Sequence, residues 1–337
     1  MNRGLLLLLA ASFLQAAIDG TVMNGTGGKP LPAVAVTLVS ISGAGMEPQG
    51  SVKSDAQGNF RFEQNPAGPA LIQAMHQGVT YSMMWQPGSA SSGLKLEVYD
   101  ASPKPEAAKV IQDIVLLEPS GTQLSIRETV IWQNGGNTTY SNPATGTLRV
   151  HVPAEGRDSL RVTATPPNGL PLGQSASPAA GENVIKVDFP IKPGETSFEV
   201  SYQVPFSSPG TFSGRSLQKD APLRLVVPSG VALTGDGLEP LGQEPQSQAS
   251  IYGVKTAEYR VEIQGMGAMG APSADSGGDS GSSGLNQILP RVYENVYPIV
   301  GFSLAILALG FVLLYRMRKA PAATAQAPST PRSKKPR

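Results

Sequence analysis

Frequent glycine and proline residues exclude long helices from most of this chain. Its 337 residues include 38 glycines and 30 prolines, and both residue types destabilise a helix interior. Between them lie short runs rich in β-branched and aromatic residues, and several alternate apolar with polar positions. This two-residue period is typical of strands with one buried face. It predicts strands at residues 33–39, 59–63, 94–99, 123–131, 146–152, 159–164, 183–189, 196–204, 223–227 and 258–263.

The predicted strands form two groups. The first occupies residues 18–86, and the polar segment 87–93 (PGSASSG) is expected to act as a flexible hinge before a second group at residues 94–264. Residues 104–110 are read as a turn or a short helix. Many short strands with turns between them predict antiparallel β-sandwiches. We therefore expect an all-β ectodomain of two sandwich domains, the first prealbumin-like and the second immunoglobulin-like.

Both ends of the chain carry membrane signals. Residues 1–17 combine one arginine, a short apolar run and a final pair of small residues, Ala16 and Ala17, as in a secretory signal peptide. Residues 296–315 are uncharged and long enough to cross a bilayer as one transmembrane helix. The basic tail at 316–337 then predicts the cytoplasmic side. Residues 265–290, rich in glycine and serine, predict a flexible stalk.

The composition limits the expected cellular location of the protein and the expected class of its partners. The chain has no cysteine and a formal net charge of +1. A long cysteine-free ectodomain favours a bacterial envelope protein over a disulfide-bonded animal one, and it excludes thiol chemistry. The basic residues are not gathered in the ectodomain, so nucleic acid is not an expected partner. We expect a single-pass cell-membrane protein whose domains are extracytoplasmic.

Four segments of the first group occur in the order of a known family pattern. They are residues 20–22 (GTV), 28–38 (GKPLPAVAVTL), 54–62 (SDAQGNFRF) and 67–74 (AGPALIQA). Together they resemble the carboxypeptidase regulatory-like domain, a small transthyretin-like β-sandwich, over residues 18–86. The family often has a tyrosine in its closing strand, which this chain lacks.

Local chemistry supports this resemblance. Asp55 is expected to accept hydrogen bonds from backbone amides of its own turn, and Gly58 to adopt a positive φ there. Phe60 and Phe62 then point to one face of the following strand, into a core. The resemblance implies a non-catalytic module related to carbohydrate-binding sandwiches. The second domain matches no named family and resembles only an immunoglobulin-like envelope domain.

Two tryptophans and an asparagine are the candidate ligand-binding residues. Trp85 ends the first group of strands, and Trp132 lies in a predicted strand just before Asn134. An exposed tryptophan ring beside amide side chains is able to stack on a sugar while the amides bond its hydroxyl groups. The alternative is that both rings are core residues, as one tryptophan often is in sandwiches; we favour the core for Trp132.

A soft-metal site is the other candidate. His76 follows Met75 and precedes Met83 and Met84, a residue set that suits copper(I). The alternative is that these methionines fill irregular space in a core. Because the chain has no cysteine and no second histidine nearby, we expect no metal and no other cofactor.

Catalytic patterns are weak. Two carboxylate pairs at a spacing of three, Glu97 with Asp100 and Asp236 with Glu239, have the residue types of a glycosidase. Exposed carboxylates are routine on sandwiches, however, and no nucleophile elbow or zinc motif occurs. We therefore expect no enzyme activity and no catalytic residues.

The sequence thus predicts a non-catalytic, membrane-anchored binding or structural protein of the cell envelope. The expected partner is a glycan, a cell-wall polymer or another envelope protein. Two alternatives stay open: a periplasmic copper-handling protein, and an accessory subunit of an envelope enzyme complex. Glycan binding predicts exposed aromatic rings on one sheet, whereas a structural role predicts buried tryptophans.

Overall fold

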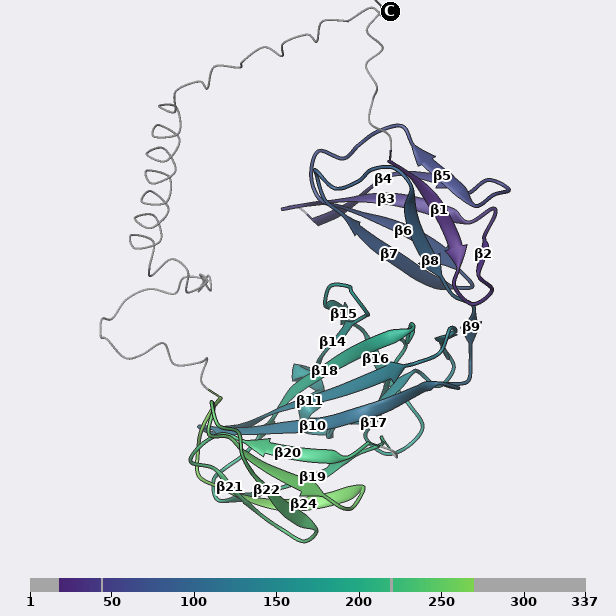
Figure 1. Cartoon of the computed structure of the whole chain (residues 1–337). Helices are drawn as coiled ribbons and strands as arrows, with labels where there is room; N and C mark the ends of the chain where they lie inside the picture. The colour runs from purple at the N-terminus through teal and green to yellow at the C-terminus, as the bar shows by residue number, and fades with distance from the viewer. Residues whose placement is uncertain (1–17, 44, 219–220, 270–337) are drawn as a thin grey trace, which may run out of the picture. The chain divides into compact units, whose positions relative to one another are not determined.

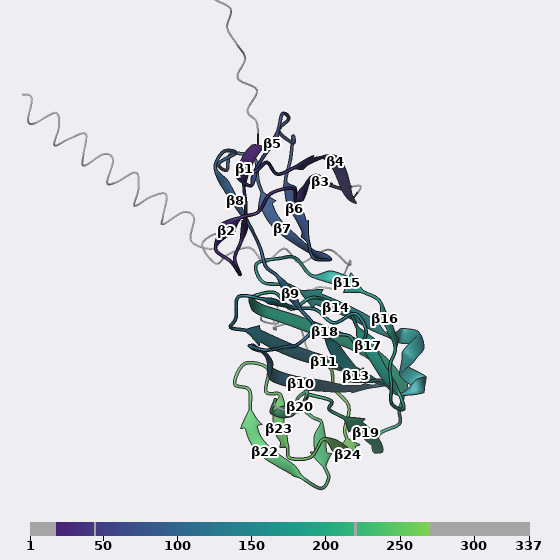
Figure 2. The same ribbon diagram turned by 90° about the vertical axis from the view of Figure 1, so that its right-hand side faces the viewer.

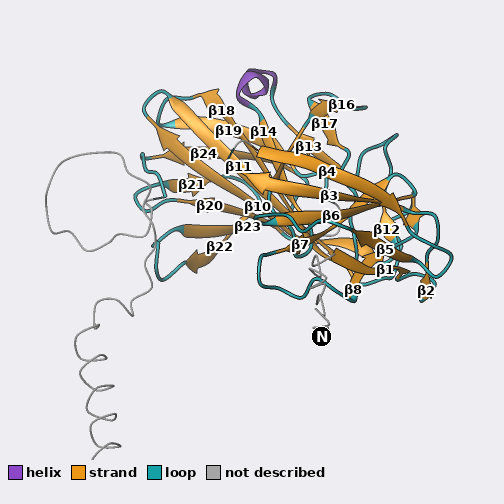
Figure 3. Cartoon of the chain, turned by 90° about the horizontal axis from the view of Figure 1, so that it is seen from above, coloured by secondary structure: helices purple, strands orange, loops and turns teal. Residues whose placement is uncertain are grey.

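The chain folds into β-sheets, as expected. The computed structural model describes residues 18–43, 45–218 and 221–269, and Figure 3 shows strands and loops with a single helical turn among them. That turn is a 3₁₀ helix at Ala154–Ser159. None of the described helical segments is long and apolar enough to cross a membrane. The predicted signal peptide, transmembrane helix and tail, and most of the predicted stalk, lie outside the described residues.

The first eight strands form two sheets around one hydrophobic cluster, drawn in purple and blue in Figure 1. One sheet contains β1 (Ile18–Asn24), β2 (Lys29–Pro30), β5 (Asn59–Phe62) and β8 (Leu94–Val98). The other has the order β4 (Gly45–Lys53), β3 (Ala35–Ser42), β6 (Ala70–His76) and β7 (Val79–Trp85). Their inward side chains, from Ile18 to Val98, make up the first core. This arrangement is compatible with a β-sandwich.

The turn before β5 has the expected chemistry. The Oδ1 atom of Asp55 accepts hydrogen bonds from the amides of Gln57 (2.9 Å) and Asn59 (2.8 Å). Gly58 has a φ of 80°. Phe60 and Phe62 are both buried, with ring centroids 6.1 Å apart. The local predictions for this turn and strand are therefore confirmed.

The first core extends beyond the expected hinge. β8 pairs in parallel with β1, from Gly20 opposite Leu94 to Asn24 opposite Val98. The carboxylate of Asp19 on β1 also accepts hydrogen bonds from the Ser92 hydroxyl and the Gly93 amide. The segment 87–93 is therefore tied to β1. The connection to the next core lies after residue 98, because the pairing of β8 buries Leu96 and Val98 against the first core.

The remaining strands surround a second, larger core. Its main sheet has eight strands, in the order β15 (Leu172–Gln174), β14 (Arg161–Thr165), β18 (Gly194–Pro205), β11 (Gln123–Asn134), β10 (Ala108–Ser120), β20 (Leu223–Val227), β23 (Ser250–Val254) and β22 (Leu238–Gln243). Two three-stranded sheets contribute to the same cluster. They contain β13 (Leu148–His151), β17 (Val184–Val187) and β16 (Ala176–Pro178), and β19 (Gly210–Arg215), β24 (Glu258–Gln264) and β21 (Ala232–Thr234). Figure 2 shows these strands in colours that run from dark blue-teal (β10 and β11) to green. Their buried side chains, from Ala108 to Ile263, form the second core.

The longest hairpin of the second core joins β10 and β11. Its register shifts at a bulge between Val110 and Gln112 and then runs without interruption to Ser120 opposite Gln123. Residues 104–107 form a turn rather than a helix, and β10 begins at Ala108. The first residues of the predicted stalk are bonded to this hairpin, since the Met269 amide donates to Glu118 Oε1 (2.7 Å).

Candidate functional site

Neither tryptophan presents a ring to solvent. Trp85 is 5% exposed and belongs to the first core, and its Nε1 donates to the Ala90 carbonyl at 3.2 Å. Trp132 is 8% exposed and belongs to the second core, where its ring contacts Tyr140 at a centroid distance of 5.8 Å. These positions match the structural alternative for both rings. A glycan platform built on either tryptophan has no support in this structure.

Asn134 is also committed to the fold. It is 3% exposed, and its Nδ2 donates to the carbonyls of Thr138 (2.8 Å) and Ile191 (3.0 Å). Its Oδ1 accepts from the Gly136 amide at 3.0 Å. The side chain thus holds the loop after β11 closed, and both N–H groups of its amide are used within the fold.

The structure does not bring the four soft-metal candidates together. Met75 and His76 are consecutive on β6, so their side chains point to opposite faces of the strand. Met75 and Met84 are exposed, whereas Met83 packs against the first core. His76 lies at the far end of the hairpin from Met83, since it pairs with Val79. Within the described residues, no group of three or more histidine, aspartate or glutamate side chains has metal-binding geometry.

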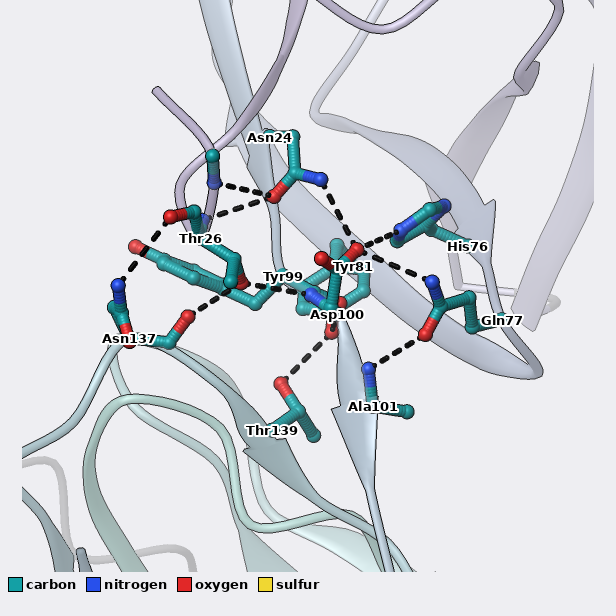
Figure 4. Close-up of polar contacts among 11 residues, drawn as sticks. Asn24, Thr26, His76, Gln77, Tyr81, Tyr99, Asp100, Ala101, Asn137 and Thr139 are labelled. Atoms are coloured by element: carbon teal, nitrogen blue, oxygen red, sulfur yellow. Dashed lines mark hydrogen bonds and ion pairs between the residues drawn. The ribbon is translucent and has the colours of Figure 1, made fainter. Parts of the chain in front are cut away.

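The structure instead places His76 in a polar cluster around Asp100. Asp100 Oδ1 lies 2.8 Å from His76 Nε2 and accepts hydrogen bonds from the side-chain amides of Asn24 (3.0 Å) and Gln77 (3.1 Å). Figure 4 shows these three side chains converging on the one carboxylate. The hydrogen bond to His76 is the main reason why the pKa of Asp100 is lower than usual. We call this group the Asp100 cluster.

A second set of contacts joins the two cores beside this cluster. The Tyr81 hydroxyl donates to the Tyr99 carbonyl at 2.8 Å, so it accepts the hydrogen bond from Thr139 Oγ1, also at 2.8 Å. The Thr26 hydroxyl donates to the Asn137 carbonyl at 2.5 Å. Tyr81 belongs to the first core, and Thr139 follows the hairpin of the second. These bonds therefore link segments that are far apart in the chain.

Lys192 adds a charged contact to the same link. Its Nζ donates to the Thr80 carbonyl at 2.6 Å and lies 5.0 Å from the centroid of the Tyr81 ring. Burial lowers the pKa of Lys192 to about 8. The contacts with one carbonyl and one aromatic face oppose this effect, because both stabilise the cationic form. We call the contacts of Thr26, Thr80 and Tyr81 with the second core the junction.

A different kind of site lies inside the second core. Asp113 on β10 is fully buried and Glu128 on β11 is 6% exposed. Asp113 Oδ2 accepts a hydrogen bond from the Ser216 hydroxyl at 2.6 Å, while its Oδ1 has no partner among the described residues. Because Val115 pairs with Glu128, the two carboxyl groups are diagonal neighbours on the inward face of the hairpin.

Burial raises the pKa of both groups. Desolvation raises the pKa of Asp113 to about 6, and desolvation together with the nearby Asp113 charge raises that of Glu128 well above its usual value. Burial and the nearby Asp113 charge therefore both favour the protonated form of Glu128. A cavity of about 10 Å³ beside them, room for about one water molecule, is lined also by His151, Tyr202 and Tyr259.

This buried pair has the residue types of an acid–base site but no access for a substrate, because the cavity is so small. The sequence reasoning missed it. The signal was present: the inward positions 124, 126, 130 and 132 of β11 are apolar and Glu128 alone is charged, and Asp113 interrupts β10 in the same way. Nothing near either residue in the sequence, however, indicates that the two carboxyl groups lie beside each other.

Glu97 and Asp100, one of the predicted carboxylate pairs, take part in separate interactions. Glu97 accepts a hydrogen bond from the Tyr99 hydroxyl and pairs with Lys95, both at 2.9 Å. Asp100 is engaged by its own cluster. The two carboxylates therefore do not face one shared substrate position.

Comparison of the whole chain with protein-family models and with curated proteins finds no match.

Proposed function

We propose that the chain is a non-catalytic, membrane-anchored binding or structural protein of the cell envelope, whose extracytoplasmic β-sheet region contacts a glycan, a cell-wall polymer or another envelope protein. The observation that carries this proposal is the engagement of its reactive side chains by one another. Asp100 Oδ1, His76 Nε2 and the Tyr81 hydroxyl are each hydrogen-bonded in the Asp100 cluster or the junction. The bond between Tyr81 and Thr139 also fixes one core to the next, which suits a rigid scaffold that presents its outer sheet surfaces to a partner.

The finer assignment of the first core also belongs to this proposal. We infer that it is a carboxypeptidase regulatory-like domain. The turn at Asp55, the positive φ of Gly58 and the buried Phe60 and Phe62 support this reading. The membrane anchor at 296–315 and the signal peptide at 1–17 are proposed on the sequence alone.

Co-sedimentation tests the binding function. The purified full-length protein is incubated with insoluble peptidoglycan, cellulose, chitin and calcium-gelled pectate, and washed at low and high salt. Retention by at least one polymer after the wash, and release by its soluble fragments, is expected. Absence of retention by every polymer contradicts glycan binding and directs the search to a protein partner, by cross-linking in intact cells.

A topology measurement tests the anchor. An epitope placed after the last residue is expected to be protected from protease in intact spheroplasts, whereas the β-sheet region is digested or released. Equal digestion of both ends contradicts the proposed orientation.

A further inference from the structure

The outer face of the eight-stranded sheet carries two arginines in line. Ser201 on β18 pairs on one side with Arg127 of β11 and on the other with Arg161 of β14. The three residues therefore lie side by side across adjacent strands, and both arginines are exposed. Directly opposite residues have Cβ atoms about 5 Å apart, so the two arginine Cβ atoms are about 10 Å apart with a small side chain between them. We call this set the arginine row.

Small hydroxyl and amide side chains surround the row. A groove of about 410 Å³ is lined by Arg127, Arg161 and Ser201 and also by Ser125, Ser159 and Gln203. Gln203 pairs with Ser125 one row along the sheet, and its Nε2 donates to the Ser125 hydroxyl at 3.2 Å. The groove thus combines two guanidinium groups with several neutral hydrogen-bonding groups on rigid strands.

The charges of the row are incompletely balanced within the chain. Arg127 has one distant partner, with its Nε 3.7 Å from Glu199 Oε1, and both side chains are about half exposed. The side chain of Arg161 makes no ion pair or hydrogen bond with any described residue. Glu118 at the groove end is occupied by the Met269 amide. An incoming anion therefore meets guanidinium donors that the fold has not used.

We propose that the arginine row binds the carboxylate of an acidic sugar unit within a polymer. Arg127 and Arg161 hold the carboxylate through charge-assisted hydrogen bonds, and Ser125, Ser201 and Gln203 bond the neighbouring hydroxyl groups. This inference rests on the proposed glycan-binding function and names the ligand class and the site.

The neighbouring groups favour a carboxylate that is surrounded by hydroxyl groups. Glu118 and Glu199 flank the row on the same face, so they limit the row to one anionic group and repel a further charge placed beside it. A polymer of uronic acids offers hydroxyl groups around each carboxylate, which match the serine and glutamine side chains. Two arginines with these neutral neighbours thus suit one carboxylate and the hydroxyl groups around it.

Affinity measurement with matched variants tests the site. The full-length protein is titrated by calorimetry with an oligogalacturonate, its methyl-esterified form, a neutral oligoglucan and a glycerol phosphate oligomer. Arg161→Gln and Arg127→Gln are expected to raise the Kd for oligogalacturonate about tenfold or more, since each removes a charged hydrogen bond. Arg224→Gln on β20 removes the same charge from another strand of this sheet and is expected to change the Kd less than twofold.

The outcomes separate the site from the broader function. Loss of affinity in both row variants and on methyl esterification, with Arg224→Gln unchanged, supports the proposal. Equal affinity for the esterified or neutral oligomer, preference for glycerol phosphate, or unchanged binding by Arg161→Gln overturns the site while glycan binding stands. Absence of binding to every oligomer and to every insoluble polymer overturns both. Circular dichroism of each variant confirms that its fold is retained.

Discussion

The carboxyl groups of Asp113 and Glu128 make the stability of the second core depend on pH. Burial raises the pKa of both above the values of the unfolded chain, so the folded state binds protons more tightly. The contribution of this pair to stability is then most favourable below about pH 4, where it is protonated in both states, and it falls as the pH rises through about 6. Ser216 offsets part of this cost by donating to the ionised Asp113.

We expect Asp113→Asn to raise the free energy of unfolding at pH 8 by about 1 to 3 kcal/mol and to change it little at pH 4, since a shift of one pKa unit corresponds to about 1.4 kcal/mol. Urea unfolding at both pH values measures this. The exposed Asp188 supplies the control, Asp188→Asn. Parallel pH profiles of wild type and Asp113→Asn would contradict the buried-pair interpretation.

Asp100 has the opposite dependence. Its pKa is lowered, chiefly by the hydrogen bond with His76, so its contribution is present above the unfolded value of about 4 and is lost as the pH falls through the folded value. We expect Asp100→Asn to destabilise the protein more at pH 6 than at pH 2.5, as measured by thermal unfolding. A loss of equal size at both pH values would show that the charge of Asp100 is not what matters.

At the scale of strands and turns, the predictable part of the fold is the part governed by local chemistry. The β-branched run of β3 and the Asp55 turn could be identified because each carries its own signal. β4 could not: its sequence GMEPQGSVK is exposed along nearly its whole length and resembles a loop. It becomes a strand because β3 offers it a partner edge. β22 behaves similarly, with Pro240 beside a bulge.

In the candidate sites, too, the contacts between residues far apart in the chain could not be predicted from the sequence. His76 is a metal-ligand candidate in the sequence, whereas its partner in the structure is Asp100, which is 24 residues away. Asp100 lies just after β8, whose place in the fold is set by its pairing with β1. The Asp113 and Glu128 pair depends on the hairpin register, which the bulge after Val110 sets. Long-range register is not written in a short stretch of sequence.

Two glycines in turns allow the cost of backbone strain to be measured separately from the cost of steric overlap. Gly58 and Gly78 have φ values of 80° and 79°. A Cβ on Gly58 would lie 2.9 Å from both Pro30 Cβ and the Val22 carbonyl oxygen, whereas nothing lies within 4 Å of one on Gly78. We expect Gly78→Ala to cost about 1 to 2 kcal/mol and Gly58→Ala about 1 to 3 kcal/mol more. Chemical denaturation of both variants tests this, and equal costs would show that strain alone decides.

At the scale of the whole described region, the junction determines whether the two cores unfold together. Tyr81 and Lys192 carry contacts from one core to the other. We expect wild type to unfold in one calorimetric transition and the double variant Tyr81→Phe, Lys192→Met to unfold in two, because each lost hydrogen bond contributes about 1 kcal/mol to the coupling.

Tyr99→Phe is the matched control for this experiment. Its hydroxyl bonds Glu97, which lies within the first set of strands, so the variant removes the same group without touching the second core. A single transition in the double variant would show that other contacts couple the cores.

The distribution of tryptophan has a practical consequence. The chain has two, Trp85 and Trp132, and each lies in a different core with a different environment. Trp85 donates its indole proton to a carbonyl, whereas the indole nitrogen of Trp132 has no partner among the described residues. Their fluorescence spectra should therefore differ. When one tryptophan is replaced with phenylalanine, the fluorescence of the other reports on the core that contains it.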